Sequence, residues 1–442
     1  MNFPDKSARP TFTIKTLGCK VNQYESQAMR ESLLRNGFSE EIGEEKTDFF
    51  IINSCTVTGK ADRDTRNLIR HFHRRNPKGK IVVAGCYAEL DSDREMLANM
   101  PGVIHLVRNR EKGRITEILT TDDGRQATDE KSGITDFKDR NRAFVKIQDG
   151  CDYRCSYCKV SIVRGPSRSR GLEEIVKEVR CLIEKGFKEI VLTGVCLGAW
   201  GKDLTDPNQP PRLTGVGWES GLAGLIKKLS RLEDKFRIRL SSIEPGYVID
   251  EIIGMLRNNA KVCKHLHMPL QSGDDRVLKL MNRPYTTGKF TQLVKKARKH
   301  IPDMAITTDV LLGFPGEDNK SFQRTEKFIK DIRPSRIHVF SYSKREGTAA
   351  AKFKSYTDKK EVRERVNIIT DLGKRLQADF AKRFAGKPQE VLIESQRDRS
   401  TGLLTGYTDR YVRVLTDGPD SLKSCLVSVR SWSPRLDNRQ II

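Results

Sequence analysis

The chain has 442 residues, of which 37% are hydrophobic, and its formal net charge is +23. No apolar run approaches the length of a membrane span, and the first residues lack the apolar core of a signal peptide, so we expect a cytoplasmic protein with no membrane partner. The excess of lysine and arginine favours a polyanionic partner, nucleic acid before acidic phospholipid, although a merely solvated basic surface would carry the same charge.

Length and cysteine content set two further bounds. A chain of this length is expected to fold into about two or three domains. Its ten cysteines are not expected to form disulfides in a reducing compartment. Ligands, catalytic groups or small core residues are the remaining roles for them.

The first part of the chain alternates predicted strands and helices, which indicates a parallel α/β domain over residues 10–120 of the Rossmann or flavodoxin-like kind. The predicted strands are 12–17, 49–53, 80–84 and 103–107, and the predicted helices are 22–35, 60–75 and 91–99.

Three cysteines of this domain occupy the same position relative to a strand. Cys19, Cys55 and Cys86 each follow the carboxyl end of a predicted strand by about two residues. In an open parallel sheet those ends share one rim, where ligands bind. The three thiols are therefore expected to converge and to hold an iron–sulfur cluster, although any one of them alone would be read as a small buried hydrophobe.

Residues 121–140 are polar and without apolar periodicity, which predicts a linker. A second α/β domain follows over 141–355, with predicted strands 143–147, 189–193, 237–241, 265–269, 305–311 and 336–340 and a helix over 172–185. Six units are too few to close an eight-unit barrel, so we expect an open partial (β/α)6 barrel whose chemistry lies on the loops after the strands. The irregular stretch 208–217 looks like a surface insertion.

A second cysteine triad directly follows the first strand of this barrel. Cys151, Cys155 and Cys158 are spaced by four and three residues, and Tyr157 precedes the last of them. No fourth cysteine or histidine lies nearby to complete a tetrahedral zinc site. Three thiolates in one loop suit a cubane cluster with one iron left open to a ligand. A structural zinc loop or three unrelated thiols are the alternatives.

The last part of the chain changes its pattern. Residues 358–383 read as a long charged helix, within a connecting segment 356–385. From residue 386 to 442 the period becomes two, with predicted strands 390–394, 401–407, 411–416 and 424–429. A small antiparallel β-barrel rich in arginine, with Tyr407 and Tyr411 interleaved, is typical of a nucleic-acid-binding module.

Together these motifs resemble the methylthiotransferases of the radical S-adenosylmethionine (SAM) class. The matching stretches include Thr-Leu-Gly-Cys-Lys-Val-Asn, Ile-Asn-Ser-Cys-Thr, Val-Ala-Gly-Cys-Tyr, Gln-Asp-Gly-Cys-Asp-Tyr-Arg-Cys-Ser-Tyr-Cys, Leu-Ser-Ser-Ile-Glu-Pro, His-Met-Pro-Leu-Gln-Ser-Gly and Asp-Val-Leu-Leu-Gly-Phe-Pro-Gly-Glu. The resemblance covers residues 12–440 and implies a TRAM-like RNA-binding module at the C-terminal end. It also implies a multidomain α/β enzyme with two 4Fe-4S clusters and SAM as cofactors.

The resemblance assigns a role to each triad. Cys151, Cys155 and Cys158 would hold the cluster that binds SAM and cleaves it to a radical, and Cys19, Cys55 and Cys86 would hold the cluster that carries the sulfur. The candidate SAM pocket consists of Tyr157, Thr193, Gly194, Ser242, Glu244, Gln271, Asp309 and Phe340.

The motifs also suggest roles for nearby arginines and for the remaining cysteines. Arg164, Arg168 and Arg170 are candidates for phosphate or SAM-carboxylate contacts, with a solvated basic loop as the alternative. The remaining cysteines are expected to pack as small hydrophobes, and they are Cys181, Cys196, Cys263 and Cys425.

The sequence around Cys19 refines the expected substrate. Gly18-Cys19-Lys20-Val21-Asn22 resembles the branch that modifies C2 of N6-threonylcarbamoyladenosine at position 37 of tRNA, in its open or cyclic form. The branches acting on isopentenyladenosine or on an aspartate of a ribosomal protein remain alternatives, as does a non-catalytic iron–sulfur RNA-binding protein. The resemblance implies the tRNA anticodon loop, a flavodoxin or ferredoxin electron donor and a sulfur donor as partners of a monomer.

Overall fold

The computed structural model describes residues 9–121, 133–138, 140–204, 221–354, 357–430 and 432–434. The chain divides into two compact units. The first contains the chain up to Lys138 together with Lys159–Gly165, and the second contains residues 139–158 and the chain from Pro166 onward.

The first unit is built on a five-stranded parallel sheet with the strand order β2-β1-β3-β4-β5. Its strands are β1 (Thr11–Thr16), β2 (Ser39–Glu40), β3 (Phe49–Ser54), β4 (Lys80–Gly85) and β5 (Val103–Val107). Its α-helices are α1 (Lys20–Arg35), α2 (Gly59–Arg75), α3 (Asp91–Ala98), α4 (Ile115–Thr121) and α5 (Val160–Arg164). The order reverses between β1 and β3, and this switch point is where ligands bind in doubly wound sheets.

Apolar side chains cover both faces of this sheet, as expected of buried parallel strands. Phe49 and Ile51 of β3 point to the face that packs on α1 and α4, where they meet Leu33. Phe50 and Ile52 point to the opposite face and pack with residues of α2 and α3. The alternation follows from the two-residue period of a strand, so a run of four apolar residues serves two cores at once.

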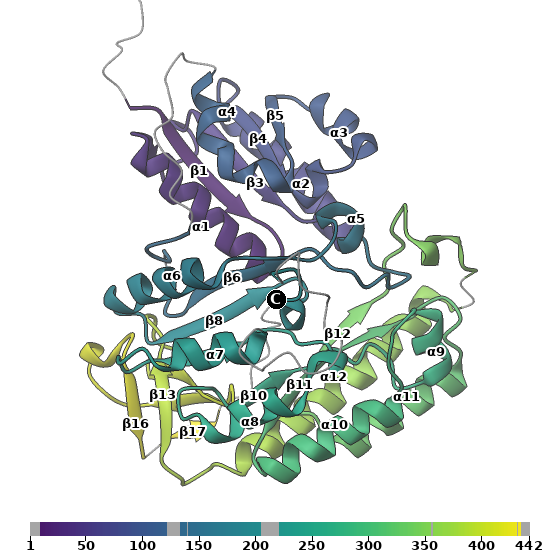
Figure 1. Cartoon of the computed structure of the whole chain (residues 1–442). Coiled ribbons are helices and arrows are strands. Elements are labelled where there is room, and N and C mark those ends of the chain that lie inside the picture. The colour runs from purple at the N-terminus through teal and green to yellow at the C-terminus, as the bar shows by residue number, and fades with distance from the viewer. Residues whose placement is uncertain are drawn as a thin grey trace, which may run out of the picture. The chain divides into compact units, whose positions relative to one another are not determined.

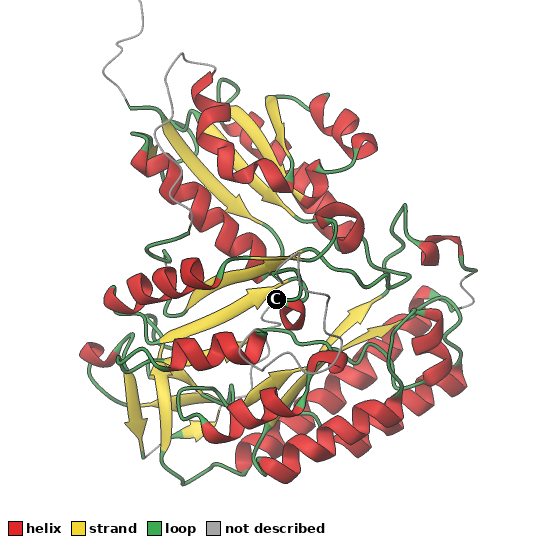
Figure 2. Ribbon diagram, in the orientation of Figure 1, coloured by secondary structure: helices red, strands yellow, loops and turns green. Residues whose placement is uncertain are grey.

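Parallel strands also organise the second unit (Figures 1 and 2). These strands are β6 (Ala143–Asp149), β8 (Glu189–Gly194), β9 (Arg237–Leu240), β10 (His265–His267), β11 (Ala305–Leu312) and β12 (Arg336–Ser341). β6, β8 and β9 form one sheet, to which β7 (Arg168–Ser169) adds an antiparallel edge, and β10, β11 and β12 form another. Isolated bridges from Ile238 to Val262 and from Ser242 to His267 continue the parallel order from β9 to β10.

Helices alternate with these strands along the chain, and one long helix follows them. They are α6 (Leu172–Glu184), α7 (Leu222–Ser230), α8 (Asp250–Asn258), α9 (Asp275–Leu280), α10 (Thr287–His300), α11 (Asn319–Ile332) and α12 (Lys359–Lys382). Phe380 of α12 and Phe384, just beyond its end, pack against Ala305 of β11 and Val412. This helix therefore joins the parallel strands to the last part of the chain.

The last part of the second unit is a five-stranded antiparallel sheet with the order β16-β13-β14-β15-β17. Its strands are β13 (Gln389–Ile393), β14 (Leu404–Thr408), β15 (Arg413–Thr416), β16 (Leu426–Val429) and β17 (Ser433–Pro434). Val391, Ile393 and Val414 form its core with neighbouring apolar residues.

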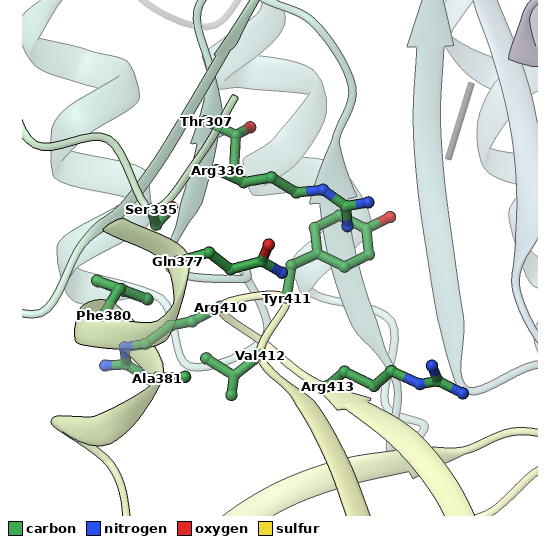
Figure 3. A pocket seen from close by; sticks show the side chains of 10 residues that line it. All are labelled: Thr307, Ser335, Arg336, Gln377, Phe380, Ala381, Arg410, Tyr411, Val412 and Arg413. Atoms are coloured by element: carbon green, nitrogen blue, oxygen red, sulfur yellow. The ribbon is translucent and has the colours of Figure 1, made fainter. Parts of the chain in front are cut away.

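The turn between β14 and β15 contacts the amino-terminal ends of the parallel strands. Tyr411 at this turn has a positive φ of 60° and its ring meets His265 edge-on, with the centroids 4.9 Å apart. A small pocket lies between this turn, the parallel strands and α12 (Figure 3). Its lining residues are Thr307, Ser335, Arg336, Gln377, Phe380, Ala381, Arg410, Tyr411, Val412 and Arg413.

The strands and helices predicted from the sequence are present with shifted ends, and the structure adds the strands β2, β7 and β17 and the helices α4, α5 and α7 to α11. Part of the predicted linker is packed, because the backbone amides of Thr135 and Asp136 donate to the carboxylate of Glu31 on α1. Most of that linker and the predicted insertion 208–217 lie outside the described residues. Among the residues described, no helix is long and apolar enough to cross a bilayer.

Candidate active site

The loop that carries Cys151, Cys155 and Cys158 follows β6, and all three thiols are partly exposed. The segment after α9 holds this loop. The amide and hydroxyl of Ser156 donate to the carbonyls of Met281 and Leu280, at 3.0 and 2.8 Å. Asn282 donates to the carbonyl of Arg154 at 2.7 Å. Hydrogen bonds therefore hold the loop on both sides of Cys155.

Gln148 at the end of β6 fixes the start of this loop. Its Nε2 donates to the carbonyls of Asp149 and Gly150, and its Oε1 accepts from the amide of Cys196 at 2.7 Å. A Cβ on Gly194 would lie 2.9 Å from that same Oε1. Gly194 therefore packs closely on Gln148, and its place in the candidate SAM pocket stays a prediction.

Arg283 connects Cys155 to Glu244, two residues of the candidate site. Its Nη1 donates to Cys155 Sγ at 3.1 Å, its Nη2 pairs with Glu244, and its Nε donates to Tyr285 Oη at 2.9 Å. The Arg283 side chain is only 3% exposed. Burial raises the pKa of Glu244, and the guanidinium opposes that shift. Arg283 was not among the predicted site residues, since it lies in the stretch Met-Asn-Arg-Pro, which matches no motif quoted above.

Cys196 is buried beside the cysteine loop. Its thiol is in hydrogen-bonding contact with Cys151 and with Tyr247, and the contact with Cys151 together with burial raises its pKa. The same contact lowers the pKa of Cys151. Cys196 was expected to pack as a small hydrophobe. It is buried, but its sulfur contacts the thiol of Cys151 as well as its apolar surroundings.

Two of the candidate SAM residues share one apolar cluster. Tyr157 and Phe340 are partly buried against Leu311 and Phe314, and the Tyr157 and Phe314 rings meet edge-on with centroids 6.3 Å apart. Burial raises the pKa of Tyr157. These side chains form an apolar wall beside the cysteine loop.

The remaining candidate SAM residues lie at strand ends. Thr193 is buried and Ser242 is exposed. Gln271 has a positive φ of 68°, held by backbone hydrogen bonds to Asp309 and from Leu311. A non-glycine residue in this region is strained, and such strain is common where a chain shapes a ligand site.

Asp309 on β11 lies between two imidazoles from the neighbouring strands. Its carboxylate oxygens are 3.2 Å from His267 Nε2 and 3.1 Å from His338 Nδ1. Burial alone would raise the pKa of Asp309, but the two histidines lower it, and burial lowers the pKa of His338. Both histidines were missed, although His267 stands in the quoted motif His-Met-Pro-Leu-Gln-Ser-Gly.

The first unit brings the other three cysteines together. Cys19, Cys55 and Cys86 follow β1, β3 and β4, which are adjacent in the sheet. Cys19 is exposed and the other two are buried. Burial, then the neighbouring Cys86 and, more weakly, Cys19, raise the pKa of the Cys55 thiol to about 12. A Cβ on Gly18 would lie 2.8 Å from Cys55 Sγ, so only glycine lets the two loops approach this closely.

A buried ionic network supports the chain segments that carry this triad. Glu25 of α1 accepts from Lys112 Nζ at 2.6 Å and from Arg164 Nη1 at 3.0 Å. Arg164 also donates to Asn22, whose own amide group donates to the carbonyls of Leu17 and Ser54 in the cysteine loops. Arg164 is therefore committed to Glu25 and Asn22, and the expected phosphate or SAM-carboxylate contact is wrong for it.

The Arg170 guanidinium is likewise occupied by partners within the chain. It pairs with Glu174 and Glu178 and donates to the carbonyl of Lys146 at 2.7 Å. Arg168 lies on the edge strand β7 and is partly exposed.

The two triads fit the groups that the sequence suggested for them. A buried guanidinium hydrogen aimed at Cys155 Sγ is what a thiolate ligand of an anionic cluster requires. In the first unit, three thiols from adjacent strand ends present soft ligands, and two of these cysteines are buried while Cys19 is exposed.

Comparison with known proteins defines the class first. Residues 145–329 match the model of the Radical SAM superfamily, and residues 11–107 match that of the Uncharacterized protein family UPF0004. The radical SAM methyltransferase TsrM from Kitasatospora setae, solved with cobalamin and a [4Fe-4S] cluster, has a similar fold at a TM-score of 0.53. It is 13% identical, and the match covers 76% of this chain and 75% of that one.

Curated relatives define the family. The threonylcarbamoyladenosine tRNA methylthiotransferase MtaB of Bacillus subtilis is 36% identical over 95% of this chain and 93% of its own length. The protein of the same name from Thermotoga maritima is 36% identical over 91% and 90%. The tRNA-2-methylthio-N(6)-dimethylallyladenosine synthase of Thermodesulfovibrio yellowstonii is 32% identical over 91% and 92%. The chain belongs to the radical SAM methylthiotransferase family.

Proposed function

We propose that this protein is a tRNA methylthiotransferase that inserts sulfur and a methyl group at C2 of N6-threonylcarbamoyladenosine, or its cyclic form, at position 37. The observation that carries the proposal is the pair of cysteine triads, one on the loop after β6 and one at three adjacent strand ends of the first unit. The names of the two relatives at 36% identity support the choice of nucleoside.

The proposed domains follow the sequence boundaries. Residues 10–120 form a flavodoxin-like cluster domain, supported by the strand order 2-1-3-4-5. Residues 141–355 form an open partial (β/α)6 barrel, supported by the parallel order from β6 to β12. A connecting helix in 356–385 leads to a TRAM-like β-barrel module over 386–442, supported by the antiparallel sheet β16-β13-β14-β15-β17.

In the proposed mechanism Cys151, Cys155 and Cys158 hold a 4Fe-4S cluster. When bound, this group supplies the electron that cleaves SAM reductively. The chain's own residues position the reactants. Tyr157 and Phe340 wall the site and exclude water, because they belong to one apolar cluster. Such positioning matters because a radical must meet only its target atom.

The other candidate SAM residues offer polar contacts in this mechanism. Ser242 and Glu244 lie after β9, Gln271 after β10 and Asp309 within β11. Thr193 and Gly194 end β8, and Gly194 packs on Gln148, which holds the start of the cysteine loop.

Cys19, Cys55 and Cys86 hold the second cluster of the proposal, which carries the sulfur to be transferred. Asn109 donates toward Cys86 Sγ at 3.7 Å and also to the carbonyl of Val163 at 2.9 Å. The chain thus supplies the buried thiols and a polar group that steadies one of them.

The proposed partners are the tRNA anticodon loop, a flavodoxin or ferredoxin electron donor and a sulfur donor, for a monomeric cytoplasmic enzyme. A net charge of +23 supports a polyanionic substrate. Dimethylallyladenosine of tRNA is the second candidate substrate, because a relative at 32% identity is named for its product. An aspartate of a ribosomal protein is the third.

An anaerobic assay tests the proposal. The reconstituted protein is incubated with SAM, reductant and tRNA that carries threonylcarbamoyladenosine, dimethylallyladenosine or neither, and the digested nucleosides are analysed by mass spectrometry. We expect a methylthio product from the first tRNA alone. Product from the second tRNA alone would move the assignment to dimethylallyladenosine, and no product from any tRNA would leave the ribosomal protein as substrate.

The number of irons bound per chain separately tests the proposal that the protein holds two clusters. About eight irons per chain are expected, and about four in the variant with Cys19, Cys55 and Cys86 replaced by alanine. About four irons in the unsubstituted protein would remove the second cluster.

A further inference from the structure

A buried cation of the second unit, Arg283, lies against Cys155. Arg283 is 9% exposed as a residue, and its guanidinium presents three N–H edges to three partners. These partners are Cys155 Sγ at 3.1 Å, the Glu244 carboxylate and Tyr285 Oη at 2.9 Å. Burying a charge costs free energy unless ion pairs and hydrogen bonds offset the lost hydration, so this arrangement requires an explanation.

The chain holds Arg283 in this position by several independent contacts. Tyr285 Oη donates to the carbonyls of Pro269 and Leu270, at 2.8 and 3.1 Å, so the partner of Nε is itself fixed. Asn282 takes a positive φ of 55° and turns the chain after α9. The amide of Arg283 then donates to the carbonyl of Leu278 at 2.9 Å.

The same segment clamps the cysteine loop. Leu280, Met281 and Asn282 contact the backbone or hydroxyl groups of residues 154–156, on either side of Cys155. The guanidinium is therefore carried by the chain segment that fixes the loop, and its approach to Cys155 follows from the fold.

We propose that Arg283 is a positioning residue that sets the reduction potential of the cluster held by Cys151, Cys155 and Cys158. A cluster with three thiolate ligands is anionic and gains a further negative charge on one-electron reduction. A charged N–H donor on one of its sulfurs stabilises the reduced state more than the oxidised state. Arg283 therefore makes reduction easier, and Glu244 on the opposite edge of the guanidinium moderates this effect.

The two residues should consequently act with opposite signs. Replacing Arg283 with a neutral side chain removes the donor and leaves the Glu244 charge uncompensated, and both changes oppose reduction. Replacing Glu244 with glutamine removes a negative charge near the cluster and favours reduction. A double replacement is expected to return toward the starting potential. A merely structural role would give no such ordering.

A redox titration tests this. The full-length protein with Cys19, Cys55 and Cys86 replaced by alanine keeps one cluster site, and its reduced form is followed by electron paramagnetic resonance without tRNA. For Arg283→Met we expect at least a tenfold fall in the equilibrium constant for reduction, or about 59 mV toward negative potential for one electron. Glu244→Gln should shift the opposite way.

The controls keep the test decisive. Arg276→Met removes an arginine of α9 whose side chain is 49% exposed and pairs with Asp318 at the surface, and it should leave the potential unchanged. Arg283→Gln replaces Arg283→Met if the latter assembles no cluster, and the same negative shift is expected. An unchanged potential in the Arg283 variant, or shifts of the same sign for the Arg283 and Glu244 variants, would overturn the proposal. Since no tRNA is present, the result does not depend on which nucleoside the enzyme modifies.

Discussion

The guanidinium carbon of Arg239 lies 3.8 Å from the centre of the Tyr411 ring. Arg239 comes from β9 and Tyr411 from the turn between β14 and β15, so this contact joins the parallel strands to the C-terminal antiparallel sheet. Arg239 also donates to the carbonyls of Thr408 and Asp409 in that turn, at 3.1 and 2.7 Å. The Arg239 guanidinium thus holds the turn by a cation–π contact with the Tyr411 ring and by hydrogen bonds to backbone carbonyls.

Removing the Tyr411 ring should loosen this junction. Tyr411→Ala loses the ring packing and the cation–π contact, and we expect the protein to be destabilised by about 2–4 kcal/mol. Tyr411→Phe keeps the ring and serves as the matched control. Hydrogen exchange of the β14 and β15 amides measures the effect. Equal protection in the two variants would show that the ring does not hold the turn.

Loss of the Glu189 carboxylate near this junction should destabilise the protein. Glu189 is fully buried and pairs with Arg237 at 2.5 Å and Arg239 at 2.7 Å. Glu189→Gln leaves two buried guanidinium groups without their counterion, which should cost about 3–5 kcal/mol near neutral pH. Urea unfolding of the cluster-free protein, followed through the exchange of β8 and β9 amides, measures this cost.

The loss of stability caused by Glu189→Gln should also depend on pH, in a direction that the pKa of Glu189 determines. Burial alone would raise the pKa of Glu189, but Arg237 and Arg239 hold it well below its usual range. This stabilisation is therefore present above the unfolded pKa of about 4.3 and is lost as the pH falls toward the depressed folded value. The difference between wild type and Glu189→Gln should shrink as the pH falls below about 4.3. A difference that stays constant with pH would contradict the pairing.

Gly85 should control the position of Cys86. It has a φ of +99°, and a Cβ there would lie 2.7 Å from the carbonyl oxygen of Ser54. Gly85→Ala should cost about 1–3 kcal/mol from backbone strain and more from that clash, and it should reduce the iron bound by the first unit. Gly37→Ala is the control, because Gly37 has a φ of +84° with no atom within 4 Å of the added Cβ. Equal iron content in both variants would show that the close contact is unimportant.

Cys196 should not be a cluster ligand despite its contact with Cys151. A cluster that binds SAM keeps one iron open, so a fourth thiolate would block it. Cys196→Ala should therefore retain about eight irons per chain, whereas Cys151→Ala should retain about four. Loss of about four irons from Cys196→Ala would make Cys196 a ligand.

Periodicity and strand-end position were sufficient to predict much of the fold. The apolar runs at residues 49–53 and 80–84 are strands buried on both faces, and such runs give a clear signal. The shared position of Cys19, Cys55 and Cys86 after their strands predicted their adjacency, because parallel strands place those ends on one rim. The short elements β2 and β7 have two residues each, which is too short for a pattern to form.

The contacts that the sequence could not predict depend on residues far apart in the chain. Arg283 meets Cys155 across 128 positions, and Arg164 meets Glu25 across 139. A charged side chain in a basic loop gives no sign of whether it is solvated or buried in an ion pair. Arg164 was therefore expected to meet an anionic ligand, although its partner is a carboxylate of the chain itself.

The first unit is discontinuous in sequence, since Lys159–Gly165 belongs to it while the residues on either side belong to the second unit. This short segment contributes Arg164 to the buried network of Glu25 and Lys112. A fragment that ends at residue 138 would keep Glu25 and Lys112 but lack the guanidinium that donates hydrogen bonds to Glu25 and Asn22. No single cut of the chain therefore yields both units complete, because a cut before residue 159 removes Lys159–Gly165 from the first unit and a cut after residue 165 removes residues 139–158 from the second.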